Sequence, residues 1–133
     1  MASELKVDKF TGVTTAGSIL VTGEGNSTTT NLQQGLAKAW LNLDGTGTIA
    51  ISDSFNTTSV TDTGTGDFDP QFTNSMNNAV YSGVGSTASG SGAYSTVAIQ
   101  SLTTSDYRLL VSDGVTSQED TDPVMTQIHG DLA

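Results

Sequence analysis

His129 is the only histidine in the sequence, and histidine is the side chain that most often serves as a general acid or base in enzymes. It lies close to the end of the chain and alternates with Gln127 in the last predicted strand. Serines and aspartates are present that could complete a Ser-His-Asp set, but no G-x-S-x-G nucleophile motif accompanies them. We therefore expect an exposed or interface histidine and a protein that is not an enzyme.

Two clusters of carboxylates could place oxygen atoms around a calcium ion. The first contains Asp67 and Asp69, and the second contains Glu119, Asp120 and Asp122. Neither cluster follows the twelve-residue EF-hand spacing. Paired acids could also serve glycoside hydrolysis, but a chain with one Trp offers little for a sugar-binding cleft. Solvated turn carboxylates are the simplest interpretation, so we expect no cofactor, with Ca²⁺ as a weak alternative.

Charge and composition exclude several other classes of function. The net charge is -10, because fourteen acids face only Lys6, Lys9, Lys38 and Arg108, so a nucleic-acid backbone would be repelled. The Gly-x-Gly pairs of GTGTIA and DTGTGD lack the GxGxxG or GK(S/T) pattern of a phosphate loop.

Cysteine is absent, which excludes disulfides and thiolate sites. No apolar run approaches about 20 residues and no signal-peptide region opens the chain, so we expect no membrane insertion and synthesis in the cytoplasm.

Short strands are the elements that the sequence predicts for positioning these residues. Fifteen glycines, two prolines and only 14% charged residues suit a β-rich fold with many turns. Beyond Gly45, short apolar-polar alternations are separated by DGTG, DTGTGD and SMNNA. Ile49 and Ile51 should share one face of a strand, and Asp44-Gly45 before it tolerates positive φ. The predicted strands span residues 47–54, 57–62, 66–73, 78–84, 93–101, 106–112 and 122–129.

Seven short antiparallel strands indicate a mainly β fold. The prediction is a β-sandwich or jelly-roll-like head, with immunoglobulin-like strand order also open. One short helix should precede it, because four apolar residues recur at helical spacing: Leu32, Leu36, Trp40 and Leu43. Thr30 or Asn31 could cap this helix. We expect the helix to end near Lys38 and a strand to follow; alternatively, residues 39–43 already form the first strand, with Trp40 sharing a face with Asn42.

The aromatic residues are spread at about one per predicted strand: Trp40, Phe55, Phe68, Phe72, Tyr81, Tyr94 and Tyr107. This distribution is typical of a filled sandwich core. We predict core positions for Trp40, Phe55 and Phe72. A carbohydrate platform would instead require several exposed rings on one face of a sheet.

Residues 1–30 are predicted to form an extended N-terminal assembly arm, and residues 31–133 the sandwich head. The apolar residues assigned to the arm are Leu5, Val7, Phe10, Ile19 and Val21. So few apolar groups cannot offset an ordering cost of roughly 1 to 2 kcal/mol per residue unless they pack against something else. We expect that partner to be another copy of the chain or a neighbouring protein, and a mobile tail is the alternative.

The stretch from Gly83 to Gly92, GVGSTASGSG, has the lowest complexity in the chain. Its composition is typical of a flexible loop, and we predict an exposed hairpin loop whose tip could contact a partner. The residues assigned to this loop are Gly83, Ser86, Ser89, Ser91 and Tyr94.

Residues 38–81 carry four linked patterns: KAW-x-N-x-x-GTGT, DSFN-x-(S/T)-S, D-x-GTGD and F-T-x-x-M-x-x-A-x-Y. The matching positions are Lys38 to Trp40, Asn42, Gly45 to Thr48, Asp53 to Asn56, Ser59, Asp62, Gly64 to Asp67, Phe72, Thr73, Met76, Ala79 and Tyr81. This segment, about a third of the chain, resembles a module of bacteriophage virion proteins, especially tail-fibre-like and short structural proteins of marine and cyanobacterial phages. No functional residues are carried over from that resemblance.

The resemblance implies a virion protein made in the host cytoplasm. We expect a non-enzymatic tail-fibre or fibre-tip protein that acts in assembly and host-surface adhesion as a homo-oligomer, with a trimer as the natural unit. Its partners would be other virion proteins, from the tail or the major capsid, and a host-surface glycan or protein. The alternative is a capsid decoration protein that clamps major-capsid subunits through residues 2–25. A small glycan hydrolase comes third, because the acid-base and nucleophile sets are missing.

Overall fold

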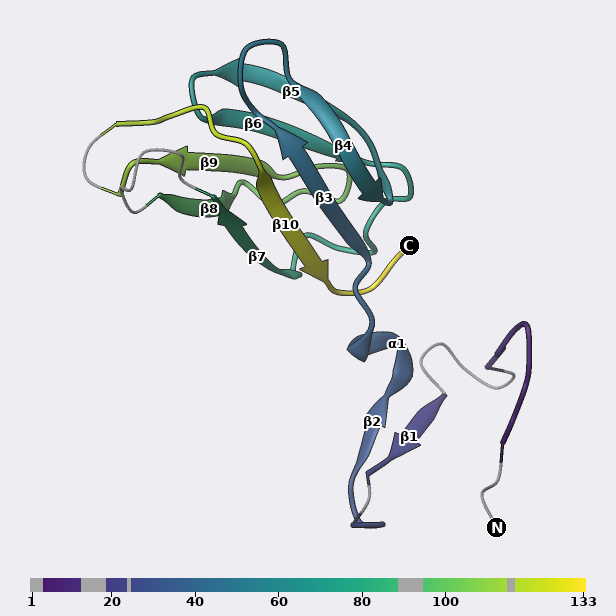
Figure 1. Ribbon diagram of the computed structural model, residues 1–133. Coiled ribbons are helices and arrows are strands. Elements are labelled where there is room, and N and C mark those ends of the chain that lie inside the picture. Colours follow the sequence, from purple (N-terminus) through teal and green to yellow (C-terminus); the bar gives the residue numbers. More distant parts are fainter. Residues whose placement is uncertain (1–3, 13–18, 24, 89–94, 115–116) are drawn as a thin grey trace. The chain divides into compact units, whose positions relative to one another are not determined.

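The computed structural model describes residues 4–12, 19–23, 25–88, 95–114 and 117–133. The chain divides into two compact units, residues 1–36 and 37–133 (Figure 1). The division therefore falls after Leu36, whereas the sequence suggested Thr30. No helix formed by the described residues is long and apolar enough to cross a membrane.

The first unit contains a hairpin and one turn of helix. Strands β1 (Leu20–Thr22) and β2 (Thr29–Asn31) pair antiparallel, and Asn26 adopts a φ of 53° between them. Helix α1 (Leu32–Gly35) follows directly, and the Asn31 side chain accepts hydrogen bonds from the backbone N–H groups of Gln33 and Gln34, at 2.8 and 3.2 Å. The predicted cap is confirmed. The helix nevertheless ends before Lys38, because Leu36 already has extended backbone.

The predicted arm is extended only in part. Residues 4–12 contain neither helix nor strand, whereas β1 and β2 pair as the hairpin. None of the described side chains of this unit is buried, and Ile19 is half-buried. Six large apolar side chains are exposed: Leu5, Val7, Phe10, Leu20, Val21 and Leu36.

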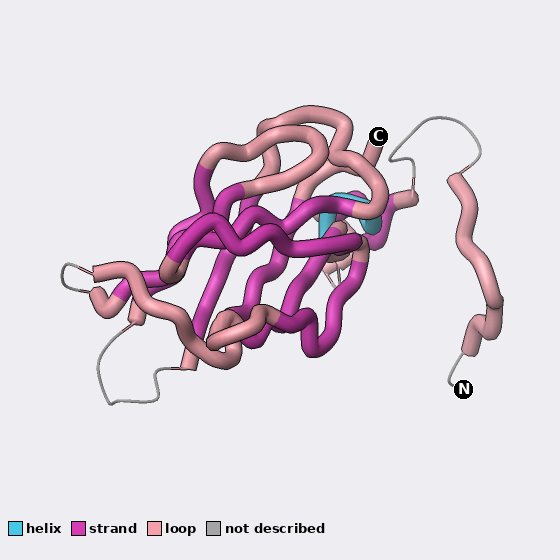
Figure 2. The backbone as a smooth tube through the Cα atoms, turned by 90° about the horizontal axis from the view of Figure 1, so that it is seen from above, coloured by secondary structure: helices cyan, strands magenta, loops and turns pink. Residues whose placement is uncertain are grey.

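The second unit is a β-sandwich of two four-stranded antiparallel sheets, which confirms the predicted fold class (Figure 1). One sheet has the order β4 (Ala50–Phe55), β3 (Ala39–Asp44), β10 (Val124–His129) and β7 (Ser82–Thr87). The other has the order β5 (Thr57–Gly64), β6 (Asp67–Phe72), β9 (Arg108–Ser112) and β8 (Thr96–Gln100). Figure 2 shows these strands in magenta and the short helix in cyan. Each predicted strand overlaps an observed one, and β3 is the strand that the alternative interpretation of residues 39–43 proposed.

The core of the second unit lies between the two sheets. Side chains alternate along β3, β6, β9 and β10, so that every second residue is buried. The buried apolar residues are Ala39, Leu41, Leu43, Phe68, Phe72, Met76, Tyr81, Tyr107, Leu109, Val111, Val124 and Ile128. The Phe72 ring contacts Tyr81 edge-on, with 5.8 Å between centroids, and lies 5.5 Å from Tyr107. Three of the core's aromatic rings therefore form one cluster.

Two of the three aromatic residues predicted for the core lie outside it. Phe72 is buried, as predicted, whereas Trp40 is 36% exposed and Phe55 is 50% exposed. The reason is the alternation of β3: Ala39 and Leu41 occupy inward positions, so Trp40 must face outward. Phe55 is paired with Trp40 on the neighbouring strand and therefore points the same way.

The first predicted turn and strand also differ from expectation. Ile49 packs against the core but precedes β4, whereas Ile51 on this edge strand remains exposed. Positive φ occurs at Gly47, at 58°, and not at Asp44-Gly45. Gly45 is needed for space instead, because a Cβ there would lie 2.8 Å from Cζ of Phe68. The ring of the core, and not the backbone angle, excludes a side chain at this position.

The predicted loop from Gly83 to Gly92 begins as a strand. Gly83 and Ser86 belong to β7, and Ser89, Ser91 and Tyr94 lie outside the described residues. A Cβ on Gly83 would lie 2.7 Å from Cδ1 of Ile99, and one on Gly85 would lie 2.3 Å from Cγ1 of Val97. These glycines are inward positions of β7 whose side-chain space is occupied by β8. Within β7, the glycines of this low-complexity segment therefore reflect close packing between the two sheets.

The hydroxyl groups of Tyr107 and Thr126 predict alkaline sensitivity of this unit. They share a buried hydrogen bond of 2.7 Å between the sheets, and burial raises the pKa of Tyr107 from 10.0 to about 12. The folded state favours the neutral phenol of Tyr107. The contribution of this group to folding stability is therefore complete below pH 10 and is lost as the pH rises through about 12. At about 1.4 kcal/mol per pKa unit, Tyr107 alone should account for a loss of roughly 3 kcal/mol in the free energy of urea unfolding between pH 9 and 12.

Tyr107→Phe supplies the control for this prediction. It should lower stability at neutral pH by about 1 to 3 kcal/mol, because Thr126 loses its buried partner. Its loss of stability between pH 10 and 12 should be smaller than that of the natural chain. Equal pH profiles for the two proteins would contradict the assignment to Tyr107.

Candidate binding site on the outer face of a sheet

The outer face of the sheet β4-β3-β10-β7 carries two rows of side chains that the strand register aligns. The first row is Phe55, Trp40, Gln127 and Val84, one from each strand in sheet order. The second row is Asp53, Asn42, Met125 and Ser86. Directly opposite residues in antiparallel pairs have Cβ atoms about 4.5–5.5 Å apart, so neighbours within a row can act on one ligand.

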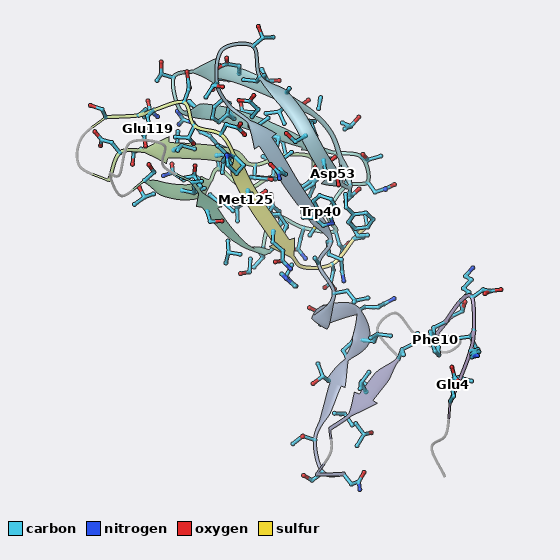
Figure 3. All side chains as sticks on the ribbon, in the orientation of Figure 1. Glu4, Phe10, Trp40, Asp53, Glu119 and Met125 are labelled. Atoms are coloured by element: carbon cyan, nitrogen blue, oxygen red, sulfur yellow. The ribbon has the colours of Figure 1, made fainter. Side chains whose placement is uncertain are left out.

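A groove of about 500 Å³ lies on this face. The outward side chains that line it are Trp40, Asn42, Val84, Ser86, Met125 and Gln127. Strand β10 runs between β3 and β7, so Met125 and Gln127 occupy the middle of the groove. Figure 3 labels Trp40, Asp53 and Met125, which come from three adjacent strands of this sheet. The volume falls within the range of about 300 to 1,000 Å³ that is typical of small-molecule sites.

The polar groups of this face both donate and accept hydrogen bonds. The amides of Asn42 and Gln127 each offer a carbonyl oxygen and an NH₂ group. The Gln127 Nε2 atom lies 3.0 Å from Nε2 of His129, and these two side chains form a hydrogen bond. Asp53 accepts a hydrogen bond from the backbone N–H of Ser54 at 2.8 Å. These contacts hold the Gln127 amide and the Asp53 carboxylate in place before any ligand arrives.

The charge near the groove is negative. Asp44, the next outward residue of β3, accepts hydrogen bonds from the hydroxyl and backbone N–H of Thr46, at 2.6 and 2.9 Å. These hydrogen bonds, with the hydroxyl first, hold the pKa of Asp44 below its usual range. Among the described residues that line the groove, none carries a charge. The site therefore combines apolar and uncharged polar groups beside the carboxylates of Asp44 and Asp53.

Three of the five carboxylates considered for calcium, those of Asp67, Glu119 and Asp120, have protein partners. Both oxygens of Asp67 bind Arg108, at 2.8 Å from Nε and 2.5 Å from Nη2, and this hydrogen bonding lowers the pKa of Asp67. Asp120 accepts a hydrogen bond from the backbone N–H of Gly66 at 2.7 Å, and Glu119 accepts one from the hydroxyl of Ser95. Within the described ranges, no group of three or more acidic or histidine side chains could hold a metal ion. These acids join segments of the sandwich.

The other residues singled out in the sequence lie in different units or on different faces of the sandwich. The described arm residues belong to the first unit, whereas the groove is formed by residues of the second. Of the predicted loop residues, Gly83 faces the core and Ser86 lines the groove. His129 follows the groove along β10 and contacts Gln127.

Sequence reasoning missed most of the groove. It assigned Trp40 to the core and gave no role to Met125 or Gln127. One signal was present: if residues 39–43 form a strand with Leu41 inward, Trp40 and Asn42 must share the outer face. The contribution of β7 and β10 had no such signal, because strand order joins residues that are distant in the chain.

Comparisons with known proteins do not identify a relative. No protein-family model matches the chain, and neither the curated proteins nor the solved structures contain a match.

Proposed function

We propose that this chain is a non-enzymatic phage virion surface protein of the tail-fibre or fibre-tip type. It assembles as a homotrimer through the first unit and adheres to the host surface through the second. The observation that carries the proposal is the exposure of six large apolar side chains in residues 4–36, none of which is buried.

The described residues of the first unit form no buried core of their own. Its hairpin has three-residue strands, and isolated two-stranded hairpins are marginal in water. Burying one large apolar side chain contributes about 1.5 to 3 kcal/mol, so association through several of them would supply the missing stabilisation. Several of them lie close together in the chain, Leu5 with Val7 and Leu20 with Val21, and exposed apolar patches mark protein interaction surfaces. Cyclic association of identical hairpins would bury the same apolar side chains in every copy.

The second unit is suited to adhesion. It has its own core, and its groove presents aromatic and amide groups to the solvent. A trimer presents three such grooves, and linked sites raise the effective concentration of each later contact. A weak single contact then becomes an effective attachment.

Support for a virion location comes from the resemblance of residues 38–81 to phage structural modules. Capsid decoration remains the alternative, since an apolar arm could equally clamp major-capsid subunits.

Light scattering on the purified chain tests the assembly. We expect a mass three times the 13.6 kDa of one chain for the natural protein. The double substitution Leu20→Ser/Val21→Ser should yield monomers with an intact sandwich, because these side chains are 58% and 51% exposed and available to a partner. Circular dichroism checks that the second unit remains folded.

Val80→Ser is the matched control, since Val80 is 89% exposed in the second unit. It should leave the mass unchanged. A natural chain that is monomeric, or a double variant that remains trimeric, contradicts assembly through the first unit. Antibody labelling of intact virions then distinguishes the two roles. Label at the tail supports the fibre role, and label on the capsid supports decoration.

A further inference from the structure

We propose that the groove on the outer face of the sheet β4-β3-β10-β7 binds a neutral oligosaccharide of hexopyranose units. This assignment rests on the proposed adhesion function and names the ligand class and the residues that bind it. Trp40 is the stacking platform, and Asn42 and Gln127 bind the hydroxyl groups at the edge of the sugar.

The exposed rings supply the first argument. Trp40 and Phe55 are directly opposite residues of β3 and β4, and both remain exposed although the core is close. Two adjacent exposed rings leave apolar surface in contact with water, and a ligand that covers them removes that surface from water. A pyranose presents C–H groups on one face and hydroxyl groups around its edge. Such a face packs on an indole ring, which is large, rigid and apolar on its surface.

The amides beside the Trp40 ring supply the second argument. Gln127 is opposite Trp40 in the register, and Asn42 lies on the same face of β3. Each amide can accept from one sugar hydroxyl and donate to the next, which suits adjacent hydroxyl groups on a pyranose. His129 holds the Gln127 side chain through the 3.0 Å contact, so the amide is positioned in advance. A preordered polar group loses less freedom on binding.

Charge selects among glycans. Asp44 and Asp53 lie on the same face as the groove, and the chain carries a net charge of -10. Sulfated, sialylated or uronic-acid glycans would be repelled by this field. Uncharged hexoses pay no such cost.

The backbone at the centre of the groove argues against an extended peptide that would add a strand there. Strands β3 and β10 are paired on both sides, so their main-chain N–H and C=O groups already have partners within the sheet. A peptide that adds a strand needs an unpaired sheet edge. The groove therefore offers side-chain amides, a hydroxyl and the Trp40 ring, which is the set that a hydroxyl-rich ligand uses.

Trp40 is the only tryptophan, so its fluorescence reports on the groove directly. The full-length chain is titrated with maltotriose, cellotriose, mannotriose and N,N′,N″-triacetylchitotriose, and with sialyllactose as the anionic comparison. We expect at least one neutral trisaccharide to change the Trp40 emission and sialyllactose to leave it unchanged. Binding by the variants is measured by ligand-observed NMR, because Trp40→Ala removes the fluorophore.

The variants separate the roles. Trp40→Ala should weaken binding by at least about tenfold, Trp40→Phe should restore most of it, and Asn42→Ala or Gln127→Ala should each weaken it about fivefold. Val80→Ala, outside the groove, is the matched control and should bind as the natural chain does. The proposal is overturned if none of the neutral trisaccharides binds, if Trp40→Ala binds as tightly as the natural chain, or if the anionic sugar binds better.

This result is independent of the assembly test. A trimeric, virion-attached chain that binds no trisaccharide would overturn the ligand and keep the proposed function. A monomeric chain without virion attachment that binds a neutral trisaccharide through Trp40 would overturn the proposed function and keep the site. Self-association through the groove, seen as a monomer after Trp40→Ala, would overturn the sugar assignment.

Discussion

Phe68→Ala should destabilise the sandwich by about 3 to 5 kcal/mol. The Phe68 ring is fully buried on β6, whose residues at this point pair with both β5 and β9. A backbone that is paired on both sides cannot collapse into the space that the ring leaves, so most of the cavity should remain. The loss is measured as the free energy of unfolding in urea, with the transition followed by circular dichroism.

Phe55→Ala is the matched control, because it removes the same ring from an exposed position. Phe55 is 50% exposed on the edge strand β4, and we expect its loss to cost less than about 1 kcal/mol. If Phe68→Ala fails to fold, Phe68→Leu should fold with a loss intermediate between the two. Equal losses for the two alanine variants would contradict the assignment of Phe68 to the core and of Phe55 to the surface.

Gly66→Ala should destabilise the sandwich by several kcal/mol. Gly66 has a φ of 64°, which costs a residue with a side chain about 1 to 2 kcal/mol. In addition, a Cβ there would lie 2.4 Å from the backbone oxygen of Val111 and 2.7 Å from the backbone nitrogen of Glu119. Neither atom can move freely, because the backbone groups of Val111 and Glu119 are hydrogen-bonded to each other at 3.2 Å and Val111 also donates to Gly66 O at 2.8 Å.

Gly47→Ala separates the two causes. Gly47 has a similar φ of 58° with nothing within 4 Å of a Cβ, so only the backbone cost of about 1 to 2 kcal/mol applies. The difference between the two variants in urea unfolding therefore measures the close approach of β9 and the Glu119 segment to Gly66. Similar losses at both positions would mean that the backbone angle alone accounts for the effect.

The sequence by itself determined the fold class and the positions of the strands. Apolar-polar alternation and turn residues are local signals, so β4, β5, β6, β8, β9 and β10 could be placed to within a few residues. The Asn31 cap was predictable for the same reason, because a cap depends only on the next three residues. The helix was overextended because the spacing from Leu32 to Leu43 fits both a helix and the outward and inward positions of a strand.

The tertiary structure decided which face of each strand is buried, and with it the candidate site. Phe55 and Trp40 are apolar enough for a core, but the inward positions beside Trp40 already hold Ala39 and Leu41. Gly85 resembles a loop residue until β8 is seen to occupy its side-chain space. The groove joins residues 40–42, 84–86 and 125–127, which only the order β3-β10-β7 brings together. Periodicity along one strand carries no information about which distant strand will lie beside it, so the groove could not be predicted.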